Sequence, residues 1–125
     1  MDRETELKIN EYLSDETKLY QDWYTGITQT EEAQYTKQVG TIPSLPELKK
    51  LCEGWINQQQ SALKAKLCEP YCQKRQQFQN QEALLIAAIA DALSIIFVGV
   101  PINFIAVAVI LVTEKHLDQF CECSQ

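Results

Sequence analysis

The chain has 125 residues, a net charge of −6 and a pI of about 4.7, and it carries five cysteines and one histidine. This length predicts a single domain, and the acidic balance argues against a general nucleic-acid-binding protein, which needs a basic surface. The first thirteen residues lack the apolar core and small-residue cleavage site of a secretory signal, so we expect the N-terminal region to lie in the cytoplasm.

The N-terminal third predicts short helices. Residues 2–13 form a polar helix, and Ser14 and Asp15 cap a second helical segment that Gly26 ends. A weak capping box opens a third helix over residues 28–38. The second segment carries an aromatic patch that we expect to pack on the rest of the domain, with an aromatic binding surface as the alternative. The patch comprises Leu19, Tyr20, Trp23 and Tyr24.

The middle of the chain predicts one long amphipathic helix. Residues 39–46 hold two prolines and a glycine and form a loop. Ser44 then caps a helix over residues 45–67 while Glu47 reaches back to the cap. Apolar residues recur along this helix near a 3.6 period, and Pro70 should end or kink it.

An apolar stretch over residues 83–112 dominates the last third, with Asp91, Ser94 and Asn103 as its only polar residues. Asn80 is a suitable N-cap for its first helix. Gly99 and Pro101 predict a break, because glycine is common just after one helix and proline at the start of the next. The second helix is expected to run from about Pro101 to Phe120.

Three arrangements compete for this stretch. Residues 92–112 alone are long enough for a transmembrane helix, and the lysines and arginine that precede them would place the N-terminus in the cytoplasm. A helical hairpin that turns at Gly99 and Pro101 suits a shallow insertion or a buried core. In a soluble bundle, the cover comes from the segment near Trp23 and from helix 45–67, and self-association completes it, because the second arm is apolar on all sides.

The cysteines give a further set of expectations. An odd number of cysteines without a signal peptide favours free thiols in a reducing compartment. A hairpin over residues 80–120 would bring four of them together, and four thiolates suit zinc. Their spacings match no standard zinc signature, so we predict no metal site and keep this thiol cluster as the alternative. It comprises Cys68, Cys72, Cys121 and Cys123.

No catalytic constellation is evident in the sequence. The single histidine, His116, lies between Glu114 and Asp118 near a charged helix end, where a histidine usually complements the helix dipole. There is no glycine-rich phosphate loop and no nucleophile elbow. We therefore expect neither an enzyme nor a bound cofactor.

The sequence thus predicts an all-α protein of four to five helices with a very apolar C-terminal helical hairpin that breaks near Gly99–Pro101. Residues 1–82 form a polar and amphipathic region, and residues 83–125 form the hairpin or membrane segment with a charged tail. The expected function is association with a membrane or a larger assembly through residues 83–112, with the N-terminal region as a cytoplasmic interaction surface. The alternatives are a cytoplasmic, self-associating interaction module with a buried hairpin, and a pore-forming or toxin-like protein.

Overall fold

The computed structural model describes residues 3–27, 43–100, 102–121 and 123, and within them the chain forms six α-helices and no strand. The all-α class is confirmed. The expected helix over residues 28–38 lies outside the described residues. The helices are α1 (Arg3–Ser14), α2 (Glu16–Ile27), α4 (Leu45–Gln77), α5 (Glu82–Ile96), α6 (Phe104–Thr113) and α7 (His116–Phe120).

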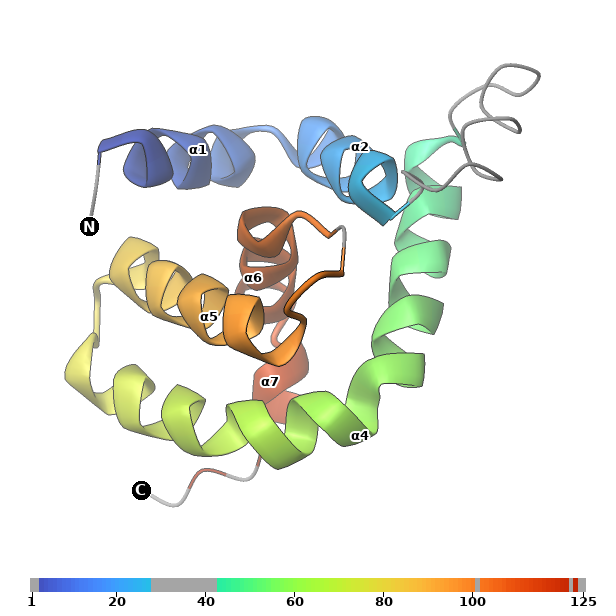
Figure 1. The fold of residues 1–125 in the computed structure, drawn as a ribbon. Helices are drawn as coiled ribbons and strands as arrows, with labels where there is room; N and C mark the ends of the chain where they lie inside the picture. The colour runs from blue at the N-terminus through green and yellow to red at the C-terminus, as the bar shows by residue number, and fades with distance from the viewer. Residues whose placement is uncertain (1–2, 28–42, 101, 122, 124–125) are drawn as a thin grey trace.

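The first two helices form one side of the molecule (Figure 1). α1 is polar except for a narrow stripe, where Ile9 and Tyr12 are buried one turn apart. Asp15 caps α2 as predicted, since its carboxylate accepts a hydrogen bond from the backbone N–H of Lys18 at 3.1 Å. Ser14 takes no part in this cap, because its hydroxyl donates back to carbonyl oxygens of α1.

Gly26 does not end α2, contrary to the prediction, because the helix continues to Ile27. The glycine serves a close approach instead. A Cβ atom placed on Gly26 would lie 3.0 Å from the backbone nitrogen of Asn103, which begins the α6 segment. The missing side chain lets α2 touch the start of α6.

The long helix α4 bends around the central helices in Figure 1 and packs on α2, α5 and α7. Pro70 does not end it, since the helix runs on to Gln77 with the proline inside. Ser44 occupies the N-cap position, but its side chain makes no cap hydrogen bond, so the predicted capping box is wrong. Gln81, and not Asn80, is the N-cap residue of α5.

The apolar stretch forms two helices that pack against each other, α5 and α6, with an irregular segment between Ile96 and Phe104. Gly99 in this segment has a φ of 80°, and Pro101 lies outside the described residues. The second helix is shorter than expected. Lys115, with a left-handed φ of 59°, stops it and separates α7 from α6.

Asn103 is the polar residue that starts α6 inside this apolar region. Its side-chain oxygen accepts a hydrogen bond from the N–H of Ala106 at 3.0 Å, which caps the helix. Its side-chain amide donates to the hydroxyl of Tyr12 at 3.0 Å, and that hydroxyl donates to Asp22 at 2.7 Å. A chain of hydrogen bonds therefore joins α1, α2 and the N-terminus of α6.

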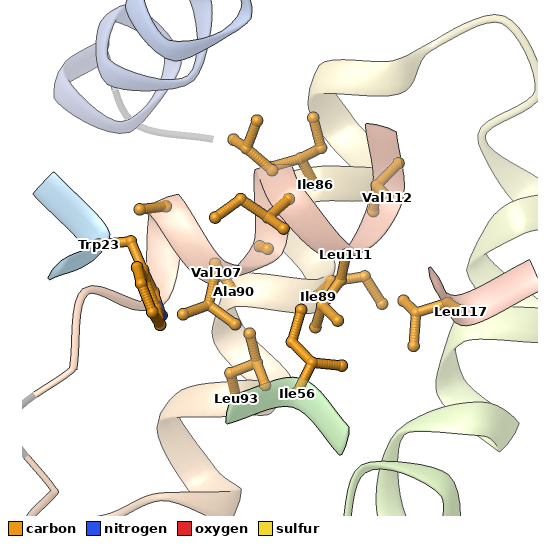
Figure 2. Close-up of a cluster of buried hydrophobic side chains, with 14 of the residues drawn as sticks. Trp23, Ile56, Ile86, Ile89, Ala90, Leu93, Val107, Leu111, Val112 and Leu117 are labelled. Atoms are coloured by element: carbon orange, nitrogen blue, oxygen red, sulfur yellow. The ribbon is translucent and has the colours of Figure 1, made fainter. Parts of the chain in front are cut away.

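α6 is the centre of the hydrophobic core. The seven consecutive side chains from Ala106 to Val112 are all buried, and α1, α2, α5 and α7 all pack on this helix. Figure 2 shows Val107 and Leu111 of α6 in one cluster of buried side chains that also includes Trp23, Ile56, Ile89 and Leu117. Of the cover that we expected, the Trp23 segment in α2 packs on α6, whereas the helix over residues 45–67, part of α4, packs on α2, α5 and α7 instead; α1, α5 and α7 complete the cover of α6.

The structure also bears on the transmembrane expectation. The described helices include none that is long and apolar enough to cross a bilayer. Residues 92–112 do not form one continuous helix, because α5 ends at Ile96 and α6 begins only at Phe104. The longer of these two apolar helices has 15 residues, against the ~20 that a bilayer core requires.

Candidate functional site

Two disulfide bonds join α4 to the C-terminal segment. Cys68 pairs with Cys121 and Cys72 pairs with Cys123, with Cα–Cα distances of 5.2 and 5.4 Å. The expectation of free thiols at these four positions is therefore wrong. The reason is geometric: α7 turns the chain back onto α4, so that residues more than fifty positions apart meet.

The spacing of these cysteines explains why both pairs form together. Cys68 and Cys72 are four residues apart on one face of α4, which separates them by ~6 Å along the helix. Cys121 and Cys123 also lie close together, since the backbone N–H of Cys123 donates a hydrogen bond to the carbonyl oxygen of Cys121 at 3.0 Å. Two closely spaced cysteines on α4 therefore meet two closely spaced cysteines after α7, and this correspondence is a signal that sequence reasoning overlooked.

The zinc hypothesis fails for the same reason. The four sulfurs do come together, as the hairpin reasoning required, but each is bonded to another sulfur and not available as a thiolate. In the described part of the chain, no group of three or more His, Cys, Asp or Glu residues is placed to hold a metal ion. Cys52 remains a free thiol, and its burial raises its pKa to about 12, which leaves it unreactive.

A cleft of about 990 Å³ opens beside the second disulfide. Its walls come from the end of α4, the turn into α5, the end of α6 and α7. Cys72 and Cys123 both line it, together with the charged side chains of Arg75, Lys115 and Asp118. Side chains of both charges therefore surround one disulfide bond.

Asp118 organises the wall of this cleft. Its carboxylate accepts a hydrogen bond from the hydroxyl of Tyr71 at 2.5 Å and lies 3.7 Å from Nε of Arg75. Burial, followed by the hydrogen bond to Asp118, raises the pKa of Tyr71. These contacts hold α7 on α4 and so place the two cysteine pairs.

Two residues with unusual backbone conformations line the same cleft. Asn80 has a φ of 64° and Lys115 a φ of 59°. Left-handed conformations are uncommon for residues other than glycine, and such residues often gather at functional sites. Both residues lie at helix boundaries, where they turn the chain so that it frames the cleft.

A separate exposed apolar surface lies at the end of α5. Ile95 and Val98 are 75% and 76% exposed, and Val100 is 43% exposed. We call these three residues the apolar tip. Beside them in sequence, Phe97 turns inward and contacts Trp55 of α4, with ring centroids 6.1 Å apart.

The other two candidates from the sequence are the aromatic patch of α2 and His116, and both lie against other parts of the fold. The aromatic patch of α2 packs inward as expected: Trp23 is fully buried and its ring centroid lies 6.2 Å from that of Trp55. His116 is half-buried at the start of α7, and burial lowers its pKa, while Glu114 and Glu53 oppose that shift.

No known protein family, curated protein or solved structure matches the chain. Its function is therefore inferred from the residues described above.

Proposed function

We propose that this protein is a non-enzymatic helical module that associates with a protein partner, in the first place a second copy of itself, through the apolar tip. The observation that carries the proposal is the exposure of three aliphatic side chains within six residues. Ile95, Val98 and Val100 project from the end of α5, although the rest of the apolar stretch is mostly covered. Exposed apolar side chains that gather into a patch mark interaction sites.

The burial of α6 narrows the proposed interface. All of its side chains from Ala106 to Val112 are covered by the protein's own helices, so they need no partner to avoid water. The proposed interface therefore does not need to include the whole of residues 83–112. The association is confined to the part that the fold leaves exposed, which is the apolar tip.

The charge distribution favours a protein over a lipid surface. No lysine or arginine occurs between residues 83 and 112, so the tip lacks the cations that hold a protein on anionic lipid headgroups. An uncharged apolar patch can instead meet its own copy without electrostatic repulsion. The cores of protein interfaces are likewise depleted of charged residues.

The disulfides support a proposal about location. Disulfides persist in oxidising compartments and are rare where glutathione and thioredoxin keep thiols reduced. We therefore place the segment from Cys68 to Cys123 in an oxidising compartment, which departs from the cytoplasmic placement expected from the N-terminal sequence. Denaturing cell lysis in the presence of N-ethylmaleimide tests this, since a reducing compartment would yield five alkylated cysteines, whereas an oxidising one would yield Cys52 alone.

Sedimentation velocity across a 100-fold concentration range tests the proposed association. The wild-type protein should shift from monomer to dimer as its concentration rises, and an Ile95→Asp/Val98→Asp variant should remain monomeric. Leu7→Asp is the matched control, because Leu7 is an aliphatic residue that is 59% exposed on a different helix, α1, and the dimerisation of this variant should resemble that of the wild type. A wild-type protein that stays monomeric throughout would refute the self-association.

Flotation with vesicles of zwitterionic and of anionic lipid distinguishes a tip that binds protein from a tip that binds a membrane. The proposal predicts that the protein stays at the bottom of the gradient with both. Flotation that Ile95→Asp/Val98→Asp abolishes would show that the tip binds a membrane instead, and leakage of the same vesicles would point to the toxin-like alternative.

A further inference from the structure

We propose that the Cys72–Cys123 disulfide is a site of thiol–disulfide exchange with a low-molecular-weight monothiol, while Cys68–Cys121 is a structural bond. The two bonds are alike in sequence separation, 51 and 53 residues. They differ in their surroundings, and this difference assigns a separate role to each.

Access is the first difference. Cys72 and Cys123 are both partly exposed and both line the cleft of about 990 Å³. Cys121 is only 3% exposed, and neither half of the Cys68–Cys121 bond belongs to the cleft wall, although Cys68 is partly exposed. Exchange requires a thiolate to reach a sulfur atom of the bond. The cleft provides that approach to one bond and not to the other.

Charge is the second difference. Arg75 lies one helical turn after Cys72 and lines the cleft, as does Lys115. The incoming thiolate and the departing thiolate are both anionic, so these cations favour the reaction. Asp118 and Glu82 share the cleft, and Asp118 lies within ion-pair distance of Arg75. The cationic contribution is therefore moderate and sensitive to salt.

The reaction takes place in two exchanges. The thiolate of the first monothiol attacks Sγ of Cys123, the S–S bond breaks, and its electron pair leaves on Sγ of Cys72, one helical turn before Arg75. Cys123 now carries a mixed disulfide, and the Cys72 thiolate can take a proton from water. A second monothiol attacks the outer sulfur of the mixed disulfide and releases the Cys123 thiolate. The protein bond gains two electrons, and the two monothiols leave as their own disulfide.

The neighbouring bond makes this exchange compatible with the fold. Cys121 stays joined to Cys68 when Cys72–Cys123 opens, so α7 remains tied to α4. The hydrogen bond from Tyr71 to Asp118 lies beside the two bonds and gives further support. Opening of the cleft bond should therefore alter the C-terminal end while the core stays closed.

Timed alkylation tests the proposal. The oxidised full-length protein is incubated with reduced glutathione, treated at each time point with an alkylating reagent under native conditions, and analysed by peptide mass spectrometry. Cys72 and Cys123 should become glutathionylated or alkylated at least tenfold faster than Cys68 and Cys121. Cys52 reports unfolding, because its thiol is buried, and it should stay unlabelled during the first phase. Equal rates for the two bonds, or labelling that appears only together with Cys52, would overturn the proposal.

Substitutions at Arg75 and at the cleft disulfide distinguish the proposed exchange reaction from a general loss of stability. Arg75→Gln should slow the first exchange several-fold, with a smaller effect at high salt, while Lys66→Gln, an exposed change elsewhere on α4, should leave the rate unchanged. Cys72→Ser/Cys123→Ser should fold and keep its remaining bond intact at the same glutathione concentration. Rapid loss of that remaining bond would show that access does not distinguish the two.

Discussion

The replacement of Asn103 by alanine tests how α6 is held in place. The substitution removes the N-cap of α6, whose oxygen lies 3.0 Å from the N–H of Ala106, and losing such a cap costs ~1 kcal/mol. It also removes the hydrogen bond to the buried hydroxyl of Tyr12, at 3.0 Å, which costs about another 1 kcal/mol. We expect Asn103→Ala to lower the free energy of unfolding by ~2 kcal/mol.

Urea denaturation followed by circular dichroism measures this loss, and thermal unfolding should show a midpoint lowered by roughly 8 °C for a chain of this length. Asn103→Ser isolates the cap, because serine also caps helices but is too short to reach Tyr12. It should cost about half as much as alanine. If Asn103→Ala costs less than ~0.5 kcal/mol, or if serine and alanine cost the same, the reasoning about the two hydrogen bonds is refuted.

The remaining predictions concern packing and pH, all measured as changes in unfolding free energy. Gly26→Ala should destabilise by ~1–3 kcal/mol, because the added Cβ meets the Asn103 nitrogen at 3.0 Å. Gly54→Ala should instead stabilise by ~0.5–1 kcal/mol, because no atom lies within 4 Å of the added Cβ on this helical residue; the same sign for both would contradict the packing argument. Leu111→Ala, at a fully buried position, should cost ~3–5 kcal/mol through the cavity it leaves. Because burial lowers the pKa of His116 from 6.5, the unfolded chain takes up its proton first as the pH falls, so stability should decline below about pH 6.5; His116→Gln should flatten that decline, and an unchanged pH profile would exclude this residue as its source.

The helical class followed from the sequence because hydrophobic periodicity is a local property. The apolar stripe in residues 45–67 and the uniformly apolar stretch predicted α4, α5 and α6 in outline. The inference that the second arm of this stretch is apolar on all sides and needs cover agrees with the burial of α6. The ends of helices were less predictable. Pro70 lies inside α4 and Gly26 inside α2, because tertiary packing overrides the local preference of a single residue.

The candidate site was only partly accessible to sequence reasoning. The meeting of Cys68, Cys72, Cys121 and Cys123 could be anticipated from a turn in the apolar stretch, but their pairing depended on the separation of α7 from α6 at Lys115. The cleft could not be anticipated at all. It arises where three helix ends and one turn converge, and no local pattern in the sequence encodes that convergence.

The contribution of α1 was missed for a related reason. Only Ile9 and Tyr12 face the core, and two residues in a polar helix give a weak periodic signal. Their effect is large because they complete the cover over α6. Because the contribution of α1 was not predicted, too few helices seemed available to cover the apolar stretch. The membrane-spanning arrangement therefore looked more favourable in the sequence than it is in the described helices.

The Cys68–Cys121 bond closes a covalent ring that contains α5, α6 and α7, whereas α1 and α2 lie outside it. A protease that cuts the segment between α5 and α6 would therefore release no fragment, and the nicked chain would keep its full mass on a non-reducing gel. The central helix α6 would stay covalently attached through its C-terminal side and would be able to pack back into the core. Cleavage at this exposed point, which includes Val98 and Val100, would leave a two-piece protein that only a reductant separates.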